Sequence, residues 1–126
     1  MIARSLAGRA ALITGASQGL GLAIARSFVL AGADLFLCAR DVATLEEARR
    51  SLAALAPAPQ RVLAAPADVS RESDVARVTQ AALAAFPSLD VLVNNAGVYG
   101  PMGSIERVEW TAWMRAIEIN LFGSVL

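Results

Sequence analysis

The stretch TGASQGLG at residues 14–21 decides the fold of this chain. An apolar run, residues 10–13, precedes it, and an Ala/Leu/Ile-rich segment follows it as far as Ala31. This order predicts a strand, a glycine turn and a helix. Gly15 allows a sharp turn, Gly19 lets backbone N–H groups approach a pyrophosphate, and Gly21 lets the helix pack close to its strand. A helix N-terminus attracts anions, so this stretch could bind a phosphate. It could also be only a turn, and the rest of the sequence is needed to distinguish the two.

Length, charge and cysteine content exclude several classes of protein. With 126 residues and a net charge of zero, the chain holds one domain with no strong charge bias. All 11 basic residues are Arg and they form no basic face, which argues against nucleic-acid and membrane partners. There is no His, and the one Cys, Cys38, lies in an apolar run, so neither a disulfide nor a His/Cys metal site is expected. The N-terminal residues show no pattern typical of a secretory signal, and we expect a cytoplasmic protein.

Apolar periodicity alternates between strands and helices along the chain. The predicted strands are residues 10–13, 34–38, 61–65 and 91–93, and the predicted helices are residues 20–31, 42–56, 70–86 and 106–126, with Asp41 as a helix cap. This alternation predicts an α/β fold, a doubly wound (Rossmann-like) parallel sheet with helices on both faces. Ligands of such sheets bind beyond the carboxyl ends of the strands, so one crevice is expected between the loops that begin at Thr14, Ala39, Ala67 and Asn94.

Three of these loops carry sequence motifs that belong together. Thr-Gly-x-x-x-Gly-x-Gly follows the first strand, Asp68-Val69 follows the third, and Asn-Asn-Ala-Gly at residues 94–97 follows the fourth. In this combination and order they resemble the short-chain dehydrogenase/reductase (SDR) family, and the resemblance runs from Leu6 to Leu126. It implies an NAD(P)-dependent oxidoreductase that transfers a hydride between a nicotinamide cofactor and a small carbonyl or alcohol substrate.

The resemblance also implies contacts with the cofactor, residue by residue. The phosphates and the adjoining ribose would contact Gly15, Ser17, Gly19, Leu20 and Gly21, with Gln18 on the rim. The nicotinamide ribose would pass Asn95, Ala96 and Gly97, and the missing side chain of Gly97 would leave room for it. Asn94 is better explained as a structural residue whose amide ties the end of the sheet.

Two polar residues have both a functional and a structural explanation. Asp68 would accept a hydrogen bond from the adenine amino group while the Val69 amide donates to the ring; otherwise Asp68 caps the helix that follows Ser70. Asn120 matches the family's helix Asn, which holds a water in a proton relay, so it is a candidate catalytic residue; otherwise it is an ordinary surface residue.

The end of the second strand bears on the choice between NADP and NAD. NAD-specific members of such folds place an acidic residue there, whereas this chain has Ala39 followed by Arg40. A guanidinium suits a 2′-phosphate, so Arg40 favours NADP, with NAD as the alternative cofactor. A solvated surface charge is the structural explanation of Arg40.

The last predicted helix carries a stripe of large apolar residues at helical spacing. Its members are Trp110, Trp113, Met114, Ile117 and Leu121. Such a stripe indicates core or a subunit interface, and we expect a homo-oligomer in the full-length form.

The residues on which SDR chemistry depends are missing from this sequence. The family uses a Tyr and a Lys four residues apart, with a Ser upstream, but this chain has no Lys and Gly103 follows its only Tyr, Tyr99, at that spacing. We therefore expect residues 1–126 to be the cofactor-binding half of a truncated fold that is inactive by itself. Two alternatives are a non-catalytic dinucleotide-binding or assembly module, and a methyltransferase, against which Ala39 and Arg40 argue because that class needs an acidic residue there.

Overall fold

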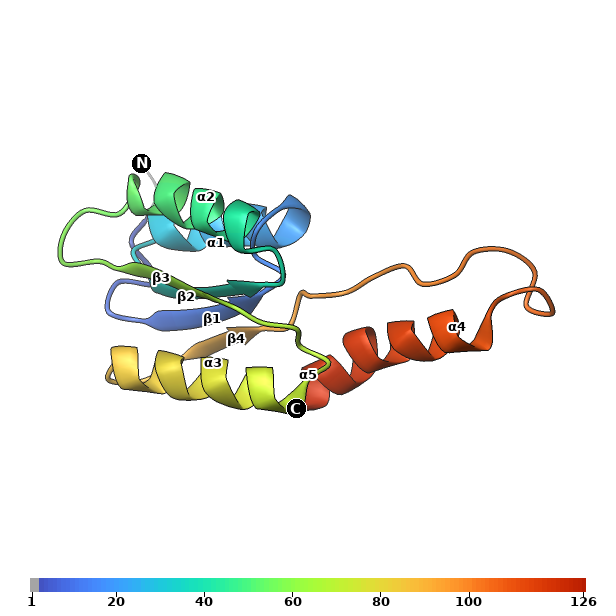
Figure 1. The fold of residues 1–126 in the computed structure, drawn as a ribbon. Coiled ribbons are helices and arrows are strands. Elements are labelled where there is room, and N and C mark those ends of the chain that lie inside the picture. Colours follow the sequence, from blue (N-terminus) through green and yellow to red (C-terminus); the bar gives the residue numbers. More distant parts are fainter. Residues whose placement is uncertain (1–2) are drawn as a thin grey trace.

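A four-stranded parallel sheet organises the computed structural model, which describes residues 3–126 (Figure 1). The strands are β1 (Ala10–Thr14), β2 (Asp34–Ala39), β3 (Val62–Pro66) and β4 (Val91–Val93), in the order β3-β2-β1-β4. β1 pairs with β2 on one side and β4 on the other, so Leu12 lies between Phe36 and Leu92. The strand order reverses at β1, which confirms the predicted doubly wound, Rossmann-like arrangement.

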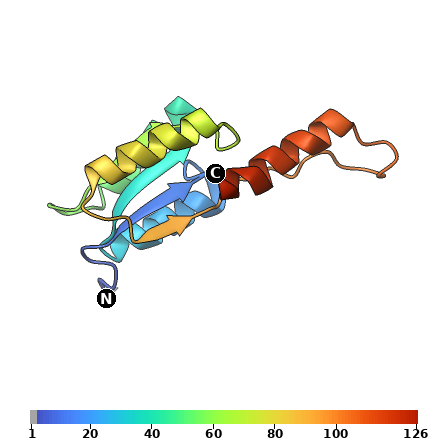
Figure 2. The same ribbon diagram turned by 90° about the horizontal axis from the view of Figure 1, so that it is seen from below.

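Helices cover both faces of the sheet (Figures 1 and 2). α1 (Gly19–Leu30) and α2 (Val42–Ala53) lie on one face, and α3 (Glu72–Ala85) lies on the other. Successive strand residues point to opposite faces, so Ile13 and Leu37 pack in the cluster beneath α1 and α2, while Leu12 and Phe36 pack in the cluster beneath α3. Both apolar clusters hold the carboxyl ends of the strands at fixed positions, and these ends carry the motifs.

Short polar contacts set the element boundaries near those ends. Oδ1 of Asp41 accepts hydrogen bonds from the Thr44 N–H at 2.8 Å and from the Thr44 hydroxyl at 2.9 Å, which confirms Asp41 as the cap of α2. α3 begins at Glu72 rather than Ser70, because Asp68 closes a turn by accepting from the Ser70 N–H at 3.0 Å.

The C-terminal helical segment differs from the prediction. It consists of α4 (Trp110–Ile117), the π-helical turn η1 (Glu118–Phe122) and α5 (Gly123–Val125). The predicted start at residue 106 is wrong, because the Arg107 N–H bonds to the Ser104 carbonyl at 2.9 Å in a separate turn. The segment extends away from the carboxyl ends of the strands and is linked to β4 by a long loop (Figures 1 and 2).

Most of the apolar stripe of this segment is exposed: Trp110, Trp113 and Leu121 are exposed, while Met114 and Ile117 are half-buried. Trp110 is 69% exposed and Leu121 is 53% exposed, and α4 contains no buried residue. The rings of Trp110 and Trp113 stack on each other with centroids 5.4 Å apart. The core explanation of the stripe is therefore wrong within residues 3–126, and the subunit-interface explanation stays a prediction. Across that same range, no helix is both long enough and apolar enough to cross a membrane.

Candidate functional site

A cleft of about 760 Å³ lies at the carboxyl ends of the strands, where the loops after all four strands meet. It is within the ~300–1,000 Å³ typical of small-molecule and cofactor sites. The structure thereby confirms the predicted crevice. Every predicted site residue except Gly21 lines it: Gly15, Ser17, Gln18, Gly19, Leu20, Arg40, Asp68, Val69, Asn95, Ala96, Gly97 and Asn120.

The three glycines of the first loop have distinct surroundings. A Cβ at Gly21 would overlap the carbonyl oxygen of Gly15 and lie 2.5 Å from Nδ2 of Asn95, so Gly21 is buried beneath the turn and allows close packing. Gly15 has φ +62°, and a Cβ there would lie 2.9 Å from Cα of Ala96. Gly19 has φ +56° and no atom within 4 Å of its Cβ position, so its backbone faces open space in the cleft. The Gly19 side of the turn can therefore admit a ligand.

The end of the sheet is tied together by Thr14 and Asn95. Oγ1 of Thr14 accepts from the backbone N–H groups of Asn95 and Ala96, both at 3.0 Å. Nδ2 of Asn95 donates to the carbonyl oxygens of Thr14 and Gly15, both at 3.1 Å. Asn95 thus performs the tie that the sequence suggested for Asn94, while Nδ2 of Asn94 contacts the Ser124 carbonyl at 3.4 Å. The role of Thr14 was missed, although it is the only polar residue of β1.

Asn120 holds the loop that follows β4. Its Oδ1 accepts from the Val98 N–H and its Nδ2 donates to the Val98 carbonyl, both at 2.7 Å. A Cβ at Gly97 would lie 3.2 Å from Oδ1 of Asn120. The missing side chain of Gly97 therefore makes room for Asn120, while the predicted room for the nicotinamide ribose stays a prediction. Asn120 lies in the π-helical turn η1, a type of irregularity that is frequent at functional sites.

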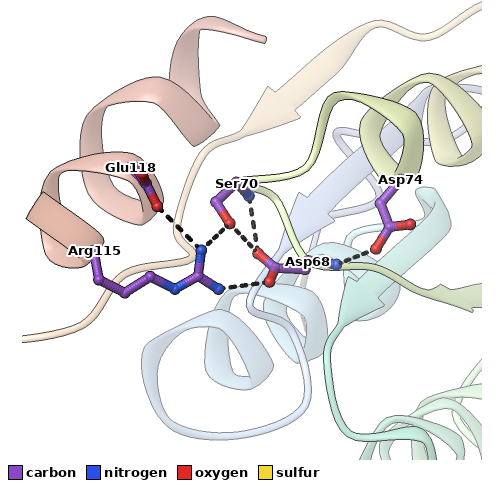
Figure 3. A network of polar contacts seen from close by, with 5 residues as sticks. All are labelled: Asp68, Ser70, Asp74, Arg115 and Glu118. Carbon is purple, nitrogen blue, oxygen red and sulfur yellow. Dashed lines mark hydrogen bonds and ion pairs between the residues drawn. The ribbon is translucent and has the colours of Figure 1, made fainter. Parts of the chain in front are cut away.

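Asp68 is the centre of a polar network (Figure 3). Its Oδ1 accepts from the N–H and the hydroxyl of Ser70, at 3.0 and 2.6 Å, and its Oδ2 accepts from Nη2 of Arg115 at 2.7 Å. Its own N–H donates to Oδ2 of Asp74 at 2.9 Å. The helix-cap explanation of Asp68 is wrong, because the residue at the start of α3 is Arg71, which makes no side-chain cap.

The network keeps the Asp68 carboxyl ionised. Partial burial by itself would raise the pKa of Asp68, but the hydrogen bonds from Ser70 and Arg115 and the charge of Arg115 outweigh it and lower the pKa from 3.8 to about 2. At neutral pH the carboxylate only accepts hydrogen bonds. Arg115, which the sequence did not single out, is the one positively charged partner of Asp68 among the described residues.

Arg40 and Tyr99 lie at the rim of the cleft. Arg40 is exposed and, within residues 3–126, forms no ion pair, while the neighbouring Asp41 carboxylate is engaged by Thr44. The Arg40 guanidinium is therefore available to a ligand. Tyr99 is 94% exposed, which fits the prediction of a rim aromatic.

Comparison with known proteins identifies the family. The family model described as short chain dehydrogenase matches residues 9–126. The chain belongs to this family. Since SDR proteins are oxidoreductases, the methyltransferase alternative is wrong.

Two SDR relatives of known activity align with nearly the whole chain. The rhamnolipids biosynthesis 3-oxoacyl-[acyl-carrier-protein] reductase of Pseudomonas aeruginosa is 38% identical over 118 residues, covering 93% of this chain and 44% of the relative. The cis-4-hydroxycyclohexanecarboxylate dehydrogenase of Sinomonas cyclohexanicum is 41% identical over 122 residues, covering 97% of this chain and 47% of the relative. This SDR chain therefore spans about half the length of the relatives that it matches.

Solved SDR structures share the fold. L-sorbose reductase from Gluconobacter frateurii, in complex with NADPH and L-sorbose, superposes with a TM-score of 0.89 and 37% identity, covering 99% of this chain and 46% of that one. The 3-ketoacyl-(acyl-carrier-protein) reductase from Brucella melitensis, in complex with NADH, superposes with a TM-score of 0.87 and 38% identity, covering 97% and 48%.

Proposed function

We propose that residues 1–126 form the cofactor-binding part of an NAD(P)-dependent oxidoreductase that exchanges a hydride with a small carbonyl or alcohol substrate. The observation that carries this proposal is the convergence of all four strand-end loops on one cleft, with Gly19 facing open space. The free N–H groups at the start of α1 are beside that space, where they suit a pyrophosphate. Related structures hold NADPH or NADH, which supports a nicotinamide dinucleotide as the ligand.

Different residues of the cleft would contact different parts of the cofactor. The first loop takes the phosphates through Gly15, Ser17, Gln18, Gly19 and Leu20, while Gly21 packs beneath it. The adenine would contact Asp68 and Val69, and the nicotinamide ribose would pass Asn95, Ala96 and Gly97. The bound nicotinamide supplies the hydride chemistry, and this chain orients it. Asn120 fixes the Val98 backbone beside the nicotinamide end of the cleft. A relay water could bind at that end.

A pair of glycine variants tests the phosphate site. Gly19→Asp places a carboxylate in the open space beside the N-terminus of α1, so NADPH affinity should fall by about tenfold or more through charge repulsion. Gly8→Asp is the matched control, because Gly8 also has a positive φ, +77°, and no atom within 4 Å, but lies outside the cleft. Both positions impose the same backbone requirement, so only the location of the charge differs.

Fluorescence titration of the purified chain with NADPH and NADH gives the readout. NADPH affinity should be unchanged in Gly8→Asp and about tenfold or more lower in Gly19→Asp. Failure of the unmodified chain to bind either dinucleotide, or equal losses in both variants, would overturn the proposal.

A second candidate is a dinucleotide-binding module that performs no chemistry. The absence of Lys from the sequence and the location of Tyr99 at the rim favour it for the chain by itself. Both candidates predict binding without turnover for residues 1–126, so the distinguishing measurement is turnover with carbonyl compounds in a longer protein that contains this chain: turnover there would favour the reductase.

A further inference from the structure

Arg115 connects the C-terminal helical segment to the loop after β3 (Figure 3). It lies in the last turn of α4, and its Nη2 donates to Oδ2 of Asp68 at 2.7 Å while its Nη1 donates to the Ser70 hydroxyl at 2.6 Å. Oε2 of Glu118 lies 3.4 Å from Nη1 and orients the guanidinium from its own helical segment. The guanidinium therefore contacts both the Asp68 carboxylate and Ser70, the other residue that bonds to this carboxylate.

Among the described residues, Oδ2 of Asp68 has one acceptor site without a donor. A carboxylate has about four lone-pair sites, two on each oxygen. Ser70 occupies Oδ1 with two donors, and Arg115 provides the only protein donor to Oδ2 among the described residues. Asp68 also lines the cleft, with its side chain 19% exposed. Oδ2 can therefore accept one further donor from a ligand in the cleft.

The backbone and the side chain of Asp68 are fixed by different partners. Asp74 holds the Asp68 N–H from α3, so the backbone position does not depend on α4. The rotation of the carboxylate depends on Ser70 and Arg115. Loss of the Arg115 bond would leave the carboxylate with partners on Oδ1 only.

We propose that Arg115 is a positioning residue for base recognition, which holds the Asp68 carboxylate so that the free site on Oδ2 meets the exocyclic amino group of adenine. This inference rests on the proposed function. A carboxylate accepts from an amino group and repels the carbonyl oxygen that replaces it in hypoxanthine. Arg115 thereby contributes to the choice of base, not only to holding α4 in place.

A structural role alone would have a different signature. The Arg115 side chain is 43% exposed, so its ion pair is accessible to solvent and contributes little to stability. If Arg115 only held α4 near the sheet, its loss would weaken every dinucleotide equally. If it aligns Asp68, its loss weakens only dinucleotides that carry the amino group.

The test compares NADPH with its hypoxanthine analogue, which has a carbonyl in place of the amino group. In titrations of the purified chain, Arg115→Met should reduce NADPH affinity by about threefold to tenfold, as expected for one misaligned hydrogen bond, and leave analogue affinity unchanged. Arg107→Met is the matched control, because Arg107 is exposed in the turn before α4 and is outside the cleft; it should change neither affinity.

Two further variants keep the inference falsifiable if Arg115→Met unfolds. Ser70→Ala should reduce the preference for NADPH over the analogue, as Arg115→Met does. Asp68→Asn should abolish that preference, since a carboxamide can accept from the adenine amino group or donate to the hypoxanthine carbonyl. Equal losses for both dinucleotides in Arg115→Met and Ser70→Ala would overturn the inference and leave the proposed function intact. Failure of the unmodified chain to bind either dinucleotide would overturn the proposed function itself.

Discussion

We predict that Arg40 sets the preference between NADPH and NADH. Its guanidinium lies at the rim of the cleft, and Asp41, the one nearby carboxylate in the sequence, is occupied by Thr44. A charge-assisted hydrogen bond to a 2′-phosphate contributes about 1.5–3 kcal/mol, and exposure to water favours the lower end. Arg40→Ala should therefore weaken NADPH binding by roughly tenfold and leave NADH binding nearly unchanged.

Ala39→Asp should reverse this preference, because a carboxylate there accepts from the ribose 2′-hydroxyl and repels a 2′-phosphate. Titration of both variants with both cofactors provides the measurement. Arg26→Ala, at an exposed position of α1 outside the cleft, serves as the control. Equal losses of NADPH and NADH affinity in Arg40→Ala would rule out the assignment.

The buried thiol of Cys38 makes the stability of the core depend on pH. Burial raises the pKa of the Cys38 thiol from 9.0 to about 11, and the charge of Arg77 offsets only part of this rise. In the unfolded chain the thiol ionises near pH 9, whereas in the folded chain it stays neutral until about pH 11. The stabilisation is therefore complete below pH 9 and is lost as the pH rises to about 11.

The free energy of unfolding should fall by about 2–3 kcal/mol across that range because of this group. Denaturant unfolding of the native chain and of Cys38→Ala at several pH values isolates the contribution. The difference between the two proteins should shrink as the pH rises. A difference that stays constant with pH would show that the thiol ionises equally easily in both states.

At the scale of elements, the parts that could be predicted are those fixed by neighbours in sequence. The glycine turn, the strands and the Asp41 cap were predicted because each depends on residues a few positions apart. The start of the last helix was not, since a turn held by Ser104 and Arg107 competes with the helical pattern. The apolar spacing of residues 106–126 predicts a helix but does not indicate the competing turn.

Side-chain roles across elements were harder to predict for the same reason. The structural role of Asn95, which the sequence suggested for Asn94, depends on contacts with Thr14 and Gly15, about 80 residues away along the chain. The Asp68–Arg115 pair joins residues 47 positions apart. The motifs identified the loops that form the site. The atoms of each loop that are free to bind a ligand could not be predicted, because they depend on how the loops pack against one another and against η1.

At the scale of the whole molecule, binding and chemistry are separable. The cleft is formed by loops from all four strands, so we expect this chain to bind a dinucleotide by itself. Reduction of a carbonyl also needs a proton donor at the substrate oxygen. The sequence contains no Lys, and its only Tyr, Tyr99, is 94% exposed. Asn120 does not titrate, and both ends of its carboxamide are bonded to Val98.

We therefore predict that the purified 126-residue chain binds NADPH but does not oxidise it in the presence of carbonyl compounds. The same sample should be used for a binding titration and for an absorbance assay of NADPH consumption, so that misfolding is not mistaken for lack of chemistry. Tyr99→Phe should leave the background rate unchanged, because Tyr99 is exposed at the rim of the cleft and the sequence offers no Lys as its catalytic partner. Turnover above a control without protein would contradict the prediction, and loss of that turnover in Tyr99→Phe would identify Tyr99 as the proton donor.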